Sequence, residues 1–247
     1  MKLGRAFIGT SGWKYRHWEG NFYPDDLKKK DHFKYFAEHF DTVELNNSFY
    51  RQPSIDNFKQ WQLQSPKNFT YAVKANRYFT HLKKLNVEQA EILDFLEASE
   101  GLENKLGPIL FQLPPKWKLN TERLERFLKM LPKKHRYAFE FRNPNWYHDD
   151  VFTLLAKYNC AFCIYELAGH QSPILCTADF VYIRLHGPEG KYQGSYNNHN
   201  LTKWHSMLVR WIKEEKDVYL YFDNDQAGYA AFNALEIKKM FRSAYQK

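Results

Sequence analysis

The sequence predicts a single (β/α)8 barrel of the TIM type that spans residues 1–247. Two observations lead to this prediction. Short apolar segments of strand-like composition alternate with segments of helical periodicity along the whole chain. No low-complexity linker separates them, so that one domain is expected. A doubly wound open sheet has the same alternation and is the alternative architecture.

Eight segments are predicted as strands, because each is short, apolar and followed by polar residues or by a Gly or Pro turn. They are residues 6–10, 42–46, 69–75, 106–115, the first part of 137–146, 160–165, 180–187 and 218–225. Seven segments between or after them have apolar residues at helical spacing: residues 27–40, 55–63, 87–96, 122–130, 151–158, 201–215 and 228–241. Thr121 precedes the fourth of these and is expected to be its N-cap.

Polar side chains recur at the ends of the predicted strands. Because strand side chains alternate in direction, Glu140 and Arg142 are expected on one face, as are Tyr182, Arg184 and His186. The strand ends of a barrel meet at one rim, so the polar residues there are expected to line one pocket. They are Glu44, Asn46, Lys74, Gln112, Glu140, Arg142, Arg184, His186 and Asp223. The residues predicted to be catalytic are Glu44, Glu140, His186 and Asp223.

A second set of residues is predicted to bind the substrate. Trp13, Tyr50 and Trp146 are expected to be exposed and to stack on bases or sugar faces. The cationic members of the set are expected to contact an anion. The set is Trp13, Asn46, Tyr50, Lys74, Gln112, Arg142, Trp146, Arg184, Tyr196 and Asn224. Trp18 is expected to be exposed in the same way.

This combination favours a hydrolase or an isomerase with a phosphodiester, nucleic-acid-derived or sugar-phosphate substrate. A carbohydrate hydrolase or isomerase would use the same aromatic residues and two carboxylates. A binding protein for nucleic acid or a metabolite, without catalysis, is the other alternative. No Walker loop, G-x-S-x-G elbow or H-E-x-x-H motif occurs. One divalent metal ion is compatible with the carboxylates and His186, and no other cofactor is predicted.

The composition indicates the kind of partner. The chain of 247 residues has a net charge of +8, which favours an anionic small molecule or nucleic acid. The absence of a signal peptide and of a long apolar run predicts a cytoplasmic protein without a membrane partner. The three cysteines agree with a reducing compartment. Cys160 and Cys163 match C-x-x-C, but positions three apart on a strand face opposite sides, which argues against a metal or redox site.

Several motifs carry a resemblance to a known family. They are Gly-Thr-Ser-Gly-Trp at 9–13, Thr-Val-Glu-Leu-Asn at 42–46, Leu-Gly-Pro at 106–108, Phe-Gln-Leu-Pro-Pro at 111–115, Ala-Phe-Glu-Phe-Arg at 138–142, Tyr-Ile-Arg-Leu-His-Gly at 182–187 and Tyr-Phe-Asp-Asn at 221–224. In this order they make the chain resemble the YecE-like family of unknown function. The resemblance implies a TIM-like barrel and no particular activity. Asp223 stands where that family commonly has Asn, which adds a carboxylate here.

Overall fold

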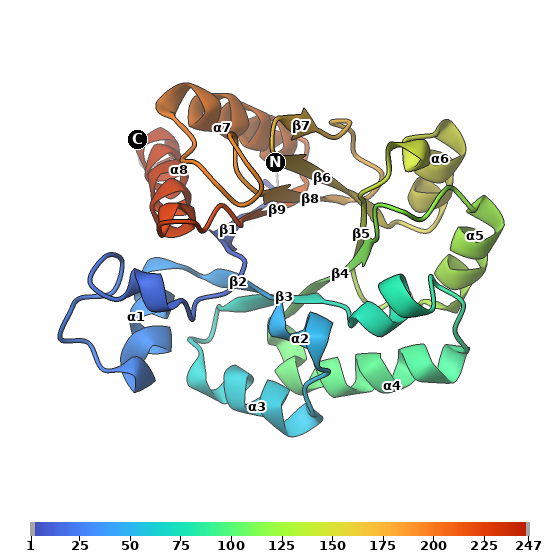
Figure 1. The fold of residues 1–247 in the computed structure, drawn as a ribbon, viewed down its shortest axis with the longest axis horizontal. Coiled ribbons are helices and arrows are strands. Elements are labelled where there is room, and N and C mark those ends of the chain that lie inside the picture. Colours follow the sequence, from blue (N-terminus) through green and yellow to red (C-terminus); the bar gives the residue numbers. More distant parts are fainter. Residues whose placement is uncertain (1–2, 246–247) are drawn as a thin grey trace. The chain divides into compact units, whose positions relative to one another are not determined.

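The structure is a computed structural model that describes residues 3–245. Two compact units are distinguished. Unit 1 consists of Met1–Glu44, Ile164–Ser172 and Phe180–Lys247, and unit 2 of Leu45–Cys163 and Pro173–Asp179. Strands and helices alternate along the chain through both units (Figure 1). That one domain spans residues 1–247 stays a prediction.

Unit 1 contains a parallel sheet in the order β1, β9, β8. Its strands are β1 (Ala6–Thr10), β8 (Phe180–Leu185) and β9 (Asp217–Phe222), and its helices are α1 (His32–His39), α7 (Asn198–Lys213) and α8 (Tyr229–Tyr245). Short 3-10 helices cover Arg16–Trp18 and Lys29–Asp31. The short strand β7 (His170–Gln171) runs antiparallel to the end of β6 (Ala161–Leu167).

Unit 2 contains a parallel sheet in the order β3, β4, β5, followed by the first residues of β6. Its strands are β3 (Thr70–Lys74), β4 (Leu106–Leu113) and β5 (Tyr137–Phe141), and its helices are α2 (Asn47–Tyr50), α3 (Ile55–Gln64), α4 (Gln89–Ser99), α5 (Thr121–Met130) and α6 (Asp149–Lys157). A π-helix covers Tyr78–Leu82, and 3-10 helices cover Glu100–Lys105 and Pro144–Trp146. The strand β2 (Thr42–Leu45) begins in unit 1 and ends with the first residue of unit 2.

These elements confirm the predicted TIM-like (β/α)8 fold class. Parallel strands followed by helices are its basic unit. The first strand also pairs with the last one: Ala6 to Thr10 of β1 lie beside Val218 to Phe222 of β9. In a doubly wound open sheet the chain starts near the middle, so that its first and last strands are not neighbours. The open-sheet alternative is therefore wrong.

Apolar side chains form the interior of each unit. In unit 1, Trp18, Tyr23 and Phe36 are fully buried, and the ring of Phe22 contacts all three. In unit 2, Phe111 stacks on Phe139 of the next strand at 5.3 Å between ring centroids. Such pairs add to the hydrophobic stabilisation that strand burial provides. No helix within residues 3–245 is long and apolar enough to cross a membrane.

One predicted helix cap is wrong. Thr121 is the first residue of α5, and the N-cap is Asn120, whose side-chain oxygen accepts a hydrogen bond from the Arg123 amide at 2.8 Å. Both residue types are favoured at this position, and the Asn side chain reaches the third amide of the helix. The predicted apolar stripe of α5 is confirmed, since Leu124, Phe127 and Leu128 are buried.

Candidate functional site

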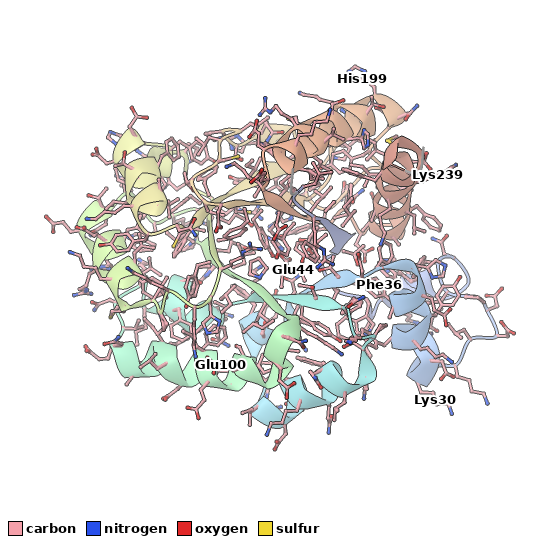
Figure 2. All side chains as sticks on the ribbon, turned by 180° about the vertical axis from the view of Figure 1, so that it is seen from behind. Lys30, Phe36, Glu44, Glu100, His199 and Lys239 are labelled. Carbon is pink, nitrogen blue, oxygen red and sulfur yellow. The ribbon has the colours of Figure 1, made fainter. Side chains whose placement is uncertain are left out.

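Glu44 of β2 is the centre of a buried polar cluster in unit 1. Its side chain is 0% exposed, and Figure 2 shows it among other side chains, whereas Lys30 and Lys239 reach the outer surface. Glu44 Oε2 accepts a hydrogen bond from the Tyr182 hydroxyl at 2.6 Å. Glu44 Oε1 accepts one from the Ser11 hydroxyl at 2.7 Å and two from the Arg184 guanidinium. The surrounding donors thus replace the water that this carboxylate loses on burial.

The alternation of side chains along β8 explains why these donors meet. Tyr182 and Arg184 are two residues apart and both bond to Glu44, as the strand period requires. The side chain of His186, two residues after Arg184, points to the same side. The neighbouring strand β9 pairs Leu185 with Phe222, and the Asp223 amide donates to the Leu185 carbonyl, which places Asp223 beside His186. The predicted common face of Tyr182, Arg184 and His186 is confirmed.

His186 and Asp223 continue the cluster toward solvent. His186 Nδ1 lies 2.9 Å from Asp223 Oδ2, and Arg184 Nη2 lies 3.3 Å from the same oxygen. His186 Nε2 lies 3.4 Å from Arg184 Nη1, which can only donate. This network therefore assigns the proton of a neutral His186 to Nδ1, from which it is donated to Asp223. His186 is fully buried, whereas the Asp223 side chain is 17% exposed, so that this end of the cluster reaches solvent.

A second acidic group, Asp225, lies two residues after Asp223. Its Oδ1 accepts a hydrogen bond from Trp18 Nε1 at 2.6 Å, and its Oδ2 lies 2.9 Å from Nε2 of His17. Burial raises the pKa of the Asp225 carboxyl to about 6, the contacts with Trp18 and His17 oppose this increase, and the charge of Asp223 adds to it. The His17 side chain is 42% exposed, so that Asp225 has an ionisable neighbour in contact with solvent.

The loop after β1 brings Tyr15 to the same cluster. The Tyr15 hydroxyl donates a hydrogen bond to the Ser11 carbonyl. Burial raises the pKa of Tyr15, and the negative charges of Asp223, Asp225 and Glu44 raise it further. Gly12 has a φ of +102°, and a Cβ atom there would lie 2.9 Å from the Tyr15 hydroxyl oxygen. A glycine is therefore needed for the loop to place Tyr15 against Ser11.

The loop after β8 is fixed by two buried asparagines. Asn224 Nδ2 donates to the Gly194 carbonyl and to Asn233 Oδ1, at 2.9 and 2.8 Å. Asn233 also accepts from the Tyr196 amide and donates to the Tyr196 carbonyl. The Tyr196 hydroxyl in turn accepts a hydrogen bond from the Gly187 amide at 3.1 Å. Asn224 and Tyr196, predicted to bind substrate, are both buried and hold this loop beside His186. Their binding role stays a prediction.

In unit 2, the side chains of Glu140 in β5 and of Arg142, which follows the strand, point to the same side, as predicted. Arg142 Nε contacts Glu140 Oε1, and the thiol of Cys163 lies 3.9 Å from Glu140 Oε2. The side chain of Glu140 is fully buried and that of Arg142 nearly so. Gln112 of β4 is the register partner of Glu140, so the three polar residues share the carboxyl end of one sheet. A catalytic role of Glu140 stays a prediction.

The predicted exposure of three tryptophans is wrong. Trp13, Trp18 and Trp146 are 8% exposed or less. Trp18 donates to Asp225, and Trp146 Nε1 donates to the Trp117 carbonyl at 2.8 Å. Buried indoles with a polar partner stabilise the fold, whereas the sequence pattern alone does not reveal which aromatic residues the loops cover. Tyr50 is the exception, because its side chain is 74% exposed.

The other two predicted residues lie close to Tyr50 in the chain or in space. Lys74 Nζ lies 4.3 Å from the ring centroid of Phe49, the neighbour of Tyr50. Asn46 is the N-cap residue of α2 and is half-buried. The predicted residues thus fall into two groups. Unit 1 joins Glu44, Arg184, His186 and Asp223, and unit 2 holds Asn46, Tyr50, Lys74, Gln112, Glu140 and Arg142.

Sequence reasoning missed several members of the unit 1 cluster. They are Ser11, Tyr15, His17, Tyr182 and Asp225. Two of them carry a signal in the sequence: Tyr182 alternates with Arg184, and Asp225 alternates with Asp223. Ser11, Tyr15 and His17 lie in a loop, where no periodicity indicates a direction.

The donor set of this cluster does not fit a metal ion. The cation between the two carboxylates is the Arg184 guanidinium, which bonds to both Glu44 and Asp223. A divalent ion at these oxygens would have to displace it. Within residues 3–245, no group of three or more His, Cys, Asp or Glu side chains is arranged to hold a metal.

Comparison with known proteins identifies relatives along the whole chain. YunF of Bacillus subtilis, described as a UPF0759 protein, is 25% identical over 272 residues, which cover 97% of this chain and 95% of YunF. YecE of Escherichia coli K12, also a UPF0759 protein, is 26% identical over 113 residues, or 45% of this chain and 42% of YecE.

Solved structures give the same result for the fold. A DUF72 family protein of Thermotoga maritima superposes with a TM-score of 0.87 at 29% identity, covering 96% of this chain and 99% of that protein. A DUF72 family protein of Enterococcus faecalis superposes with a TM-score of 0.82 at 19% identity, covering 96% of this chain and 95% of that protein. The family model described as "Protein of unknown function DUF72" matches residues 7–247. The chain therefore belongs to the DUF72 family.

Proposed function

We propose that this protein is an enzyme that performs acid–base chemistry on an anionic substrate, with Asp223 and Asp225 as the two carboxyl groups that transfer protons. The observation that supports this most is the difference between their surroundings. Asp223 is held by Arg184 and His186, whereas burial brings the pKa of Asp225 to about 6. Two carboxyl groups with separately tuned environments are what a general base and a general acid need near neutral pH.

Glu44 has a different role in this proposal. Its two oxygens accept four hydrogen bonds from protein donors, and its side chain has no solvent exposure. A carboxylate so fixed is suited to orient Arg184, which then bonds to Asp223. Glu44 and Arg184 are therefore positioning residues, and His186 fixes Asp223 from the other side.

Proton exchange with solvent is assigned to His17. Its imidazole is 2.9 Å from Asp225 and is the more exposed member of that pair. A histidine at this place can pass a proton between solvent and Asp225 after each turnover, since its ring nitrogens can donate and accept a proton. The anionic nature of the substrate is inferred from the net charge of +8. Hydrolysis or isomerisation of a phosphodiester, a nucleic-acid component or a sugar phosphate fits these groups, and a cytoplasmic location is proposed with it.

The test begins with a thermal-shift panel of sugar phosphates, nucleotides and oligonucleotides, with and without Mg²⁺, because a ligand of the folded state raises the melting temperature. Turnover of each hit is then measured against pH. We expect a turnover change centred near pH 6 that is absent in Asp225→Asn, and a rate loss of about 100-fold or more in Asp223→Asn. Asp26→Asn, an exposed carboxylate in the same unit, is the control. A hit that binds without turnover would favour the non-catalytic alternative.

A further inference from the structure

Unit 2 presents an exposed aromatic side chain on a rigid polar framework. Tyr50 is the last residue of α2 and is 74% exposed, whereas its neighbour Phe49 is buried. The Phe49 ring packs edge-on against two other rings. Its centroid lies 5.1 Å from that of Tyr50, at an interplanar angle of 89°, and 5.0 Å from that of His81, at an angle of 85°. The Tyr50 ring thus packs against a buried phenyl ring, and most of its own surface is exposed to solvent.

Two basic residues lie on the elements that carry this aromatic group: Lys74 ends β3, and Arg77 is the N-cap residue of the π-helix that contains His81. Lys74 Nζ lies 4.3 Å from the Phe49 ring centroid. The pKa of His81 is lowered, first by burial and then by the charges of Lys74 and Arg77. Both cations therefore act on the imidazole that packs against Phe49. We call Phe49, Tyr50, Lys74, Arg77 and His81 the Tyr50 patch.

Backbone contacts hold the elements of the Tyr50 patch together. The Ser48 hydroxyl donates to the Lys74 carbonyl at 2.6 Å, and Asn76 Nδ2 donates to the Ser48 carbonyl at 3.0 Å. These bonds join α2 to the end of β3, and Figure 1 shows the two elements side by side. The patch is therefore built before any ligand arrives, which lowers the entropic cost of binding.

The segment after β3 has an unusual backbone. His81 lies in the π-helix Tyr78–Leu82, whose end is followed by Lys84 and Leu85 at φ values of 49° and 62°. Two consecutive left-handed residues other than glycine are strained, and π-helices occur frequently at functional sites. This conformation keeps His81 against Phe49 and leaves Leu82 largely exposed.

We infer that the Tyr50 patch is a binding site for single-stranded nucleic acid, in which a base stacks on Tyr50 and the adjacent phosphates lie at Lys74 and Arg77. An exposed ring accepts the face of any base, and nearby cations neutralise the backbone. A duplex does not suit the patch, because its bases are stacked on each other. The inference does not rest on the proposed catalysis, since the patch and its test involve binding alone.

The experiment measures the fluorescence anisotropy of a labelled 12-residue oligothymidylate at 50 mM NaCl. Tyr50→Ala removes the stacking surface, and Lys74→Gln removes one cation. We expect Tyr50→Ala to weaken binding about 5- to 100-fold, since stacking contributes on this order per base. Lys74→Gln should weaken binding about tenfold, since one phosphate contact is lost. Tyr50→Phe should bind within about twofold of wild type, because the ring is retained. Lys74→Gln should also make binding less dependent on salt. The slope of the logarithm of the binding constant against the logarithm of the salt concentration should decrease in magnitude by about 0.7, the value for one phosphate contact.

Two matched controls lie on α3 of the same unit. Lys59→Gln changes the net charge as Lys74→Gln does, and Leu63→Ala removes an exposed apolar side chain as Tyr50→Ala does. Both should bind within about twofold of wild type. Melting temperatures establish that all variants are folded. Unchanged binding by Tyr50→Ala, an equal loss in Lys59→Gln and Lys74→Gln, tighter binding of a 12-base-pair duplex, or no binding by the wild type would each overturn the inference.

Discussion

Arg184 holds the carboxylate of Glu44 with two of its nitrogens: Nε is 3.2 Å and Nη2 is 2.7 Å from Glu44 Oε1. Both side chains are 1% exposed or less. Because the pair is buried, neither charge can be solvated by water when the other is removed. The integrity of the unit 1 cluster therefore depends on this pair.

Replacement of Glu44 by Gln should destabilise the protein by about 3–5 kcal/mol, because it removes the charge that compensates a buried guanidinium. The free energy of unfolding is measured by urea denaturation. Glu19→Gln, which removes one partner of the surface pair Glu19–Lys29, is the control and should cost less than about 1 kcal/mol. A Glu44→Gln protein as stable as this control would show that the buried pair does not stabilise the fold.

Glu140→Gln tests the second buried pair. The amide keeps the shape of the side chain and much of its hydrogen bonding to Arg142, so we expect a folded protein. If Glu140 is catalytic, activity on the substrate found by the thermal-shift panel should be greatly reduced, because proton transfer needs the carboxylate. Activity per folded molecule and the urea midpoint are measured together. A loss of several kcal/mol in stability with unchanged specific activity would show that Glu140 is structural.

The raised pKa of Asp225 predicts a dependence of stability on pH. The folded-state pKa is about 6 against an ordinary value of 3.8, so the native state binds the proton more tightly. The resulting stabilisation is complete below about pH 4 and is lost as the pH rises to about 6. At about 1.4 kcal/mol per pKa unit, the loss amounts to roughly 3 kcal/mol at most.

Asp225→Asn should abolish this contribution. Relative to wild type, the variant should therefore gain unfolding free energy between pH 4 and pH 7.5, as followed by urea denaturation at several pH values. Comparing the two proteins at each pH cancels the other titrating groups. For Asp26→Asn, the difference in unfolding free energy from wild type should stay nearly constant over this pH range. A constant difference for Asp225→Asn as well would contradict the assignment.

Asn233 should control the loop after β8. In Asn233→Ala, the Tyr196 amide and carbonyl and the Asn224 side chain each lose a hydrogen-bond partner. We expect hydrogen exchange at the Tyr196 amide to accelerate about tenfold or more, because a bond to a buried group contributes about 1–2 kcal/mol to local stability. Asn198→Ala, at the exposed start of α7, serves as the control. Equal exchange in both variants would mean that the loop is held by other contacts.

The alternation of strands and helices, and the direction of side chains along each strand, follow from the amino-acid pattern. Apolar strand segments need burial and have a period of two, so the pairing of Glu140 with Arg142 and the common face of Tyr182, Arg184 and His186 could be predicted. The exact cap of α5 could not, because Asn120 and Thr121 are both favoured N-cap residues.

Tertiary packing determines how loops and non-neighbouring strands meet. Ser11, Tyr15 and His17 reach the cluster through a loop whose conformation depends on Gly12 and on packing, neither of which has a periodic signal. It also decided which aromatic rings are covered: Trp146 is buried against Phe141, while Tyr50 projects into solvent. Burial depends on contacts between distant segments, and these contacts set the desolvation that raises the pKa of Asp225.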